Sequence, residues 1–288
     1  MTAGLVKHWL ESGRLELPLP ASGRTAERWQ RLARLAEDNI VAARVAEAHV
    51  DAVAILHELG GKPPEPGQLW AVWAAESPDA VLIATDINGA FTLNGTKVWC
   101  SGAGFCTHAL VTARPDNGAQ GLFALPLTDP AVKPLPSTWW TAGVAGSDTR
   151  SVQFTNAHAV AVGDPGDYLD RPGSWHGAIG VAACWLGGAR RVADPLYRCT
   201  GSQSADAYSL AHLGVVDAAL AAGDATLAAA ALQVDSDPFD RSGTVQLLAV
   251  ASAPPWNMPS MKRSPAPVAP WAPGHYARRG ATRSGWPT

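Results

Sequence analysis

The stretch Leu93-Asn94-Gly95-Thr96-Lys97-Val98-Trp99-Cys100-Ser101-Gly102-Ala103-Gly104 carries the strongest local signal in the chain. It places an Asn-Gly pair between two runs of alternating apolar and polar residues. Both residues of the pair tolerate the positive φ of a type I′ turn, which joins two antiparallel strands. The sequence therefore predicts a hairpin with strands over residues 90–93 and 97–101 and its turn at Asn94-Gly95.

Further short strands surround this hairpin. Apolar, β-rich runs cover residues 69–75, 80–85, 109–113, 121–127, 150–154 and 157–162. Asn88-Gly89 and Pro115-Asp116-Asn117-Gly118 are turn sequences between them. Many short strands separated by frequent turns are typical of an antiparallel barrel or sandwich, so residues 67–165 are predicted to form a central β-barrel domain.

Helical patterns lie on both sides of this domain. Residues 25–59 repeat apolar side chains at steps of three and four, which leaves open whether they form one helix or two. Ala- and Leu-rich runs over 175–196 and 205–234 predict further helices, with Gly187-Gly188 allowing a close neighbour. The second run is predicted to be amphipathic, with these residues on or near one face: Leu210, Leu213, Val216, Leu220, Leu227 and Leu232.

The last segment, residues 249–288, differs in composition from the rest. It is rich in proline, which excludes a helix or a central strand and is typical of a disordered tail. Trp256-Asn257-Met258 is encoded by TGG-AAY-ATG, and reading from the third base gives Glu followed by His or Tyr. Because this frame continues into a helix-compatible sequence, we expect a frameshifted or truncated product that has lost its natural C-terminal helix.

Composition limits the classes of protein to consider. The 288 residues, 47% of them apolar, suffice for more than one domain: an N-terminal helical region (1–66), the barrel (67–165), a C-terminal helical region (166–248) and the tail. A net charge of −3 gives no reason to expect a nucleic-acid or membrane partner. The chain shows neither a signal peptide nor a run of about 18 apolar residues, so a cytoplasmic location is expected. Neither its four cysteines nor its histidines have metal-ligand spacing, which predicts reduced thiols and no metal site.

Several segments resemble one family. Residues 93–103 resemble the Leu-Asn-Gly-x-Lys-x-Trp hairpin in the central β-domain of the acyl-CoA dehydrogenase superfamily. Trp70-Ala71-Val72-Trp73-Ala74-Ala75-Glu76-Ser77-Pro78 lies where that superfamily has an apolar strand ending in a Thr-Glu-Pro turn. Gly143-Val144-Ala145-Gly146-Ser147-Asp148, followed by Val152-Gln153-Phe154, resembles its Gly-rich turn and Val-x-Phe strand. The chain is identified as a short, atypical member, which implies a multi-domain α and β fold with helices, a central antiparallel β-barrel and further helices.

The resemblance also implies a cofactor site. Trp99, Cys100 and Ser101 occupy strand positions that lie against a flavin, and Trp73 and Ala75 match the neighbouring strand. A flavin requires an apolar wall for its ring and hydrogen-bonding groups for its polar edge. Core packing is the competing role for both tryptophans. The implied cofactor is FAD, the implied substrate a small molecule such as an acyl-CoA, and the implied assembly a homo-oligomer in which a neighbouring subunit completes each site.

The chain also departs from the superfamily's pattern. Acyl-CoA dehydrogenases abstract a proton with a Glu from the C-terminal helices, but no Glu follows Glu76 in this sequence, so the catalytic residues are unknown. Asp194 and Asp217 are the remaining candidate bases. Cys100-Ser101-Gly102-Ala103 also resembles the reduced-flavin monooxygenases of the same fold, which need no such base. Three interpretations stay open: an FAD-dependent dehydrogenase acting on a CH–CH group, a reduced-flavin monooxygenase, and a decayed member without activity.

Overall fold

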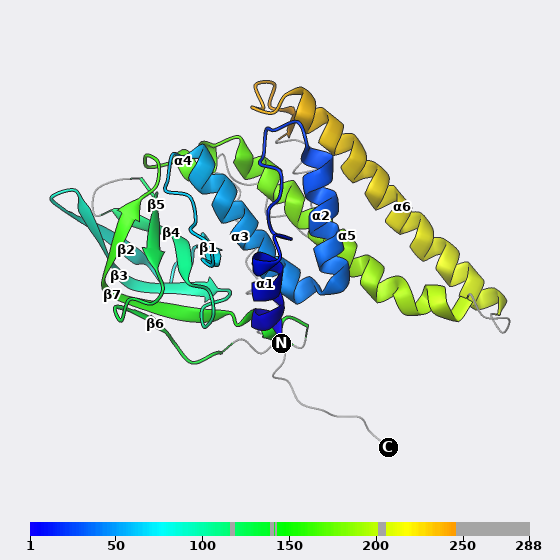
Figure 1. The fold of residues 1–288 in the computed structure, drawn as a ribbon, viewed down its shortest axis with the longest axis horizontal. Coiled ribbons are helices and arrows are strands. Elements are labelled where there is room, and N and C mark those ends of the chain that lie inside the picture. The colour runs from blue at the N-terminus through cyan, green and yellow to red at the C-terminus, as the bar shows by residue number, and fades with distance from the viewer. Residues whose placement is uncertain (116–118, 139–140, 142, 201–205, 246–288) are drawn as a thin grey trace, which may run out of the picture.

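The chain folds into a β-barrel flanked by helices from both ends of the sequence (Figure 1). The computed structural model describes residues 1–115, 119–138, 141, 143–200 and 206–245. The predicted Pro-rich tail and most of the predicted turn at 115–118 lie outside these residues. The predicted order of helices, strands and helices is confirmed.

Three helices precede the barrel: α1 (Thr2–Glu11), α2 (Thr25–Asp38) and α3 (Ile40–Glu58). The sequence left open whether residues 25–59 form one helix or two, and Asn39 divides them. Its backbone is extended at φ −162°, and its side chain accepts a hydrogen bond from the Ala42 N–H at 2.9 Å, which caps α3. Helix α1 was not predicted, although Val6 and Trp9 on one of its faces are buried.

Within the described residues, seven strands form the sheet: β1 (Trp70–Trp73), β2 (Leu82–Ile87), β3 (Ala90–Cys100), β4 (His108–Pro115), β5 (Gly121–Pro126), β6 (Val132–Pro134) and β7 (Arg150–Ala161). Strands β4, β2, β3, β7 and β5 close into a ring because β5 pairs with both β7 and β4. This closure confirms the predicted barrel, although β4 pairs in parallel with β1 and β2 rather than antiparallel. Closure leaves few unpaired strand edges.

The predicted hairpin turn at Asn94-Gly95 is wrong. Both residues lie inside the continuous strand β3, where the register with β7 shifts between Leu93 and Gly95. Gly95 has φ +124°, and a Cβ there would overlap the carbonyl oxygen of Val81, so the glycine is required for the close approach of the β2 segment. The turn between β2 and β3 is the predicted Asn88-Gly89 pair, with φ values of 58° and 85°.

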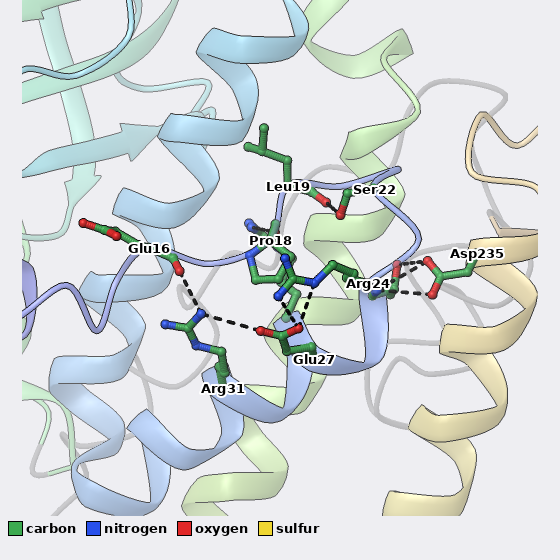
Figure 2. A network of polar contacts seen from close by, with 10 residues as sticks. Glu16, Pro18, Leu19, Ser22, Arg24, Glu27, Arg31 and Asp235 are labelled. Carbon is green, nitrogen blue, oxygen red and sulfur yellow. Dashed lines mark hydrogen bonds and ion pairs between the residues drawn. The ribbon is translucent and has the colours of Figure 1, made fainter.

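The C-terminal helices are α4 (Asp167–Asp170), α5 (Gly173–Thr200) and α6 (Ala207–Ser236), and a short 3₁₀ helix, η1 (Ala145–Ser147), precedes β7. The close neighbour predicted at Gly187 is the backbone of Ala33 on α2, which a Cβ at Gly187 would overlap. Asp235 of α6 also holds α2, because it accepts hydrogen bonds from Thr25 N at 3.2 Å and Thr25 Oγ1 at 2.6 Å (Figure 2). A carboxylate at a helix N-terminus accepts hydrogen bonds from free backbone N–H groups and interacts favourably with the helix dipole.

The predicted amphipathic face of α6 is confirmed in part, since Leu213, Val216, Leu220 and Leu227 are half-buried along one side of the helix. The buried side chains of this helix are Ala230, Ala231 and Val234, near its C-terminal end, while Leu210 is 52% and Leu232 is 74% exposed. By length and composition α6 could cross a membrane, and 11% of its most apolar window is buried. We call residues 191–200 and 206–220, the ends of α5 and α6 that extend past α2 away from the barrel, the arm (Figure 1).

Candidate functional site

The sequence-predicted site lies at the C-terminal end of β3, where the strand is irregular. The register between β3 and β7 shifts between Lys97 and Cys100, and Trp99 inside this bulge has φ +58°. Bulky residues rarely adopt this conformation, which costs of the order of 1–3 kcal/mol. Bulges often reorient a side chain next to a functional site. The strain is therefore concentrated at the half-buried residue that was predicted to line the cofactor.

The structure brings two of the predicted residues into direct contact. The indole N–H of Trp73, a buried residue at the end of β1, donates to the backbone carbonyl of Ser101 at 2.9 Å. Trp99 and Cys100 precede Ser101 along β3, and Ala75 lies half-buried two residues after β1. Because its N–H is already bonded within the protein, Trp73 supports the site rather than offering a donor to a ligand.

Cys100 is placed differently from its two neighbours. Its side chain is fully buried, with Sγ 3.4 Å from the Lys97 carbonyl oxygen, and burial raises the pKa of the thiol. The thiol therefore faces the barrel core and stays protonated at neutral pH. Any contact of Cys100 with a ligand would come from its backbone.

A row of hydroxyl groups lies behind Ser101. Ser101 Oγ is 2.8 Å from Thr149 Oγ1, which is 2.8 Å from Ser147 Oγ. Thr149 and Ser147 are 6% and 7% exposed. Ser147 lies in the Gly-rich turn seen in the sequence, but its contact through Thr149 with Ser101 was not predictable, because the two segments are far apart in the chain.

An ion pair between the buried Lys97 and the partly exposed Glu76 was not predicted either. Lys97 Nζ lies 2.6 Å from Glu76 Oε1 and donates to the carbonyl oxygen of Thr112 at 2.8 Å. Gln120 donates to the same Glu76 oxygen at 2.7 Å. Burial lowers the pKa of Lys97, and the hydrogen bond and charge of Glu76 act in the opposite direction. Both residues belong to the motifs described from the sequence, Lys97 to residues 93–104 and Glu76 to residues 70–78. A charged residue between apolar residues of a predicted strand was the signal that could have indicated the pair.

Two cavities lie away from Trp99. One of about 440 Å³ lies among α2, α5 and α6, with Trp29 and Leu186 on its apolar side and Arg190 at its polar edge. Arg190 bonds Glu37 at 2.7 Å and also Asp224. The second cavity, of about 220 Å³, lies between β4, β5 and α4 and includes Thr112, Gln120 and Tyr168 in its lining.

Comparison with known proteins confirms the resemblance drawn from the sequence. Residues 74–157, which include β2, β3, β4 and β5, match the family described as acyl-CoA dehydrogenase, middle domain. The match covers the central domain of this chain, which therefore resembles the middle domain of that family. A search of curated proteins finds no match to the sequence.

Solved structures share this acyl-CoA dehydrogenase-like fold across most of the chain. KijD3 in complex with dTDP superposes with a TM-score of 0.70 at 17% identity, covering 86% of this chain and 73% of that one. A nitrososynthase from Micromonospora carbonacea var. africana gives 0.66 at 23% identity, covering 85% and 75%. TdsC from Paenibacillus sp. A11-2, with FMN and indole, gives 0.67 at 18% identity, covering 87% and 80%. At these identities the likeness establishes the fold alone.

Trp99 and Ser101, which were predicted to line the cofactor, suit the flavin that this fold implies. Trp99 offers a half-buried aromatic surface, and Ser101 next to it offers a half-buried hydroxyl group. A planar, largely apolar ring with one polar edge needs this combination of an aromatic wall and a few placed polar groups. The match rests on residue types and on the strained placement of Trp99.

Proposed function

We propose that this chain is a flavin-binding oxidoreductase, and that it acts as a monooxygenase with externally reduced flavin. The observation that carries the proposal is Trp99, held at φ +58° beside Ser101 in a fold whose solved relatives include FMN complexes of KijD3 and TdsC. Both FMN and FAD carry the isoalloxazine ring that this wall suits. A bound reduced flavin would supply the electrons that activate O₂.

The residues available for acid–base chemistry favour the monooxygenase over a dehydrogenase. No Glu follows Glu76 in the sequence, and Glu76 itself is bonded to Lys97 and Gln120 inside the barrel. Asp194 pairs with Arg191 at 3.4 Å and also with Arg198, and Asp217 accepts from the Tyr197 hydroxyl at 2.6 Å, so both candidate bases are engaged on the arm. A proton-abstracting base needs a free carboxylate within reach of the substrate.

Each wall residue has a separate role in this proposal. The Trp99 indole would stack on the ring and exclude water from one face, because aromatic surface buried against another ring is favourable. The Ser101 hydroxyl would bond the polar edge of the ring. Trp73 would hold the Ser101 backbone in place through its 2.9 Å hydrogen bond. The substrate is proposed to be a small organic molecule.

The second candidate is an FAD-dependent acyl-CoA dehydrogenase acting on an acyl thioester. The match of residues 74–157 to the acyl-CoA dehydrogenase middle domain favours it. It requires a free base, whereas Asp194 and Asp217, the candidate bases on the C-terminal helices, are bonded to other side chains.

We also propose that the chain forms a homo-oligomer through the arm and works in the cytoplasm. Val192, Tyr208 and Val215 on the arm are 81%, 79% and 72% exposed, and apolar surface of this kind often marks a contact between proteins. Light scattering across a range of protein concentrations tests the assembly, since a monomer at every concentration would contradict it.

The visible absorbance of the purified protein incubated with FMN or FAD separates the candidates. A monooxygenase should bind flavin that acyl-CoA does not reduce, and flavin reduced by an external donor should react with O₂ on the protein. Reduction by acyl-CoA would instead support the dehydrogenase. If neither flavin binds in either redox state, the proposed function is wrong and the chain is a decayed member of its superfamily.

A further inference from the structure

The hydroxyl groups of Ser101, Thr149 and Ser147 form a chain with a defined end. Ser101, Thr149 and Ser147 are linked by two contacts of 2.8 Å, and Ser147 Oγ lies 2.8 Å from the backbone carbonyl oxygen of Val144. Serine and threonine hydroxyls each carry one hydrogen, whereas a carbonyl oxygen only accepts. The end of the chain therefore determines the direction of every bond in it.

The donor in each hydrogen bond of this chain can be assigned by starting from Val144 and moving outward to Ser101. Ser147 Oγ donates its hydrogen to the Val144 carbonyl oxygen, which also accepts from the Ser147 N–H at 3.0 Å, and with that hydrogen used Ser147 accepts from Thr149. Thr149 then uses its own hydrogen on Ser147, so it can only accept from Ser101. The hydrogen of Ser101 consequently points inward, and its oxygen presents only lone pairs to a ligand.

Burial stabilises this arrangement. Thr149 and Ser147 are 6% and 7% exposed, so water has little access to replace either partner. Breaking one link would leave a buried hydroxyl without its bond, which is costly in a low-dielectric interior. Neighbouring hydrogen bonds also hold the backbone: the N–H groups of Gly102 and Gly104 donate at 2.8 Å to the Ser147 carbonyl oxygen and to an Asp148 carboxylate oxygen.

We infer that Thr149 and Ser147 are positioning residues that fix the Ser101 hydroxyl as an acceptor, so that the site selects a ligand group carrying an N–H or O–H. This inference rests on the proposed function. The oxidised isoalloxazine ring has a single N–H, at N3, whereas two-electron reduction adds an N–H at N5. An acceptor at the polar edge where reduction adds this donor favours the reduced ring over the oxidised one.

The test is to measure the dissociation constants of oxidised and reduced FMN under anaerobic conditions, together with the midpoint potential of the bound flavin. The wild-type protein should bind reduced FMN about two- to tenfold more tightly, the range that one hydrogen bond supplies. Thr149→Val and Ser147→Ala each free the Ser101 hydrogen to point outward. Both variants should lose or reverse the preference and lower the midpoint potential.

Thr149→Ser is the matched control, because it keeps the hydroxyl and therefore the direction of the chain. It should retain the wild-type preference, which a role in packing alone would not predict. Equal affinity of the wild-type protein for both redox states overturns the inference, as does an unchanged preference in Thr149→Val and Ser147→Ala. If FMN does not bind in either redox state, the proposed function fails and this inference fails with it.

Discussion

The barrel and the arm are both rich in apolar residues but bury them very differently. In the barrel, Leu93, Val111 and Val152 are fully buried, and five strands close on themselves. On the arm, Val192 and Val215 are 81% and 72% exposed. The barrel therefore completes its core within one chain, whereas the arm carries apolar surface that this chain does not cover.

The largest expected difference between the two regions comes from the same substitution made in each. Gly95→Ala puts a Cβ against the Val81 carbonyl oxygen at a residue with φ +124°, so it should lower the free energy of unfolding by about 3 kcal/mol or more. Gly214→Ala on the arm meets no atom within 4 Å and should stabilise its helix by up to about 1 kcal/mol. Urea denaturation of both variants measures the difference, and equal effects would contradict it.

The junction between the barrel and α3 should be sensitive to pH. His49 Nδ1 accepts from the Trp70 N–H at 3.2 Å, and burial lowers the pKa of His49 from 6.5 to about 4. Between these values the unfolded chain binds a proton that the folded chain does not. The contribution of His49 to the free energy of unfolding should therefore be complete above pH 6.5. The free energy of unfolding should fall by up to about 3 kcal/mol as the pH drops to 4.

Denaturation at several pH values measures this dependence. The variant His49→Asn should remove most of it, whereas His212→Asn on the exposed arm should leave it unchanged. A pH dependence that persists in His49→Asn would assign the titration to another group.

Loss of a cation should matter more in the barrel than near the arm. Lys97→Met leaves the third-exposed Glu76 without its buried partner and should cost about 2 kcal/mol, because one charge remains unpaired. Arg190→Met removes the ion pairs of Arg190 with Glu37 and Asp224. Because the Arg190 side chain is 31% exposed, the free energy of unfolding should fall by less than about 1 kcal/mol. Thermal unfolding compares the two variants, and a larger loss in Arg190→Met would reverse the predicted order.

The smallest expected effect on folding is a polar change on the arm. Val215→Thr should change the free energy of unfolding by less than about 0.5 kcal/mol, because the side chain is already exposed. The same change at the fully buried Val152 should cost about 1 kcal/mol or more, since it buries a hydroxyl group. If the arm forms the proposed interface, Val215→Thr should also weaken self-association, as measured by light scattering.

The sequence predicted the order of the elements better than their local geometry. Asn88-Gly89 and Asn94-Gly95 have the same turn chemistry, yet the first forms the turn and the second lies in a bulge. Gly95 is needed there because the chain at Val81 approaches closely, and that contact depends on the folded sheet. The exposure of Leu210 and Leu232 was equally inaccessible, because apolar spacing along a helix does not show which of its positions a neighbouring element covers.

The candidate site was predictable only in its linear part. Trp99, Cys100 and Ser101 could be selected because they are consecutive in one motif, but the hydrogen bond from Trp73 to the Ser101 carbonyl oxygen was not predicted. The positive φ of Trp99, the Lys97–Glu76 pair and the link from Ser101 to Thr149 each depend on strands that meet across the barrel. Residue type alone does not specify such contacts.

The proposed flavin wall can be tested by titrating FMN into variants of two tryptophans and following flavin fluorescence. Trp99→Phe and Trp99→Ala remove part or all of the wall, and Trp185→Ala changes a 45% exposed tryptophan on α5 just before the arm. We expect Trp185→Ala to bind FMN like the wild-type protein. The dissociation constant of FMN should be about tenfold higher or more in Trp99→Ala, with Trp99→Phe between the two. Wild-type affinity in a folded Trp99→Ala variant would show that the flavin, if bound, lies elsewhere.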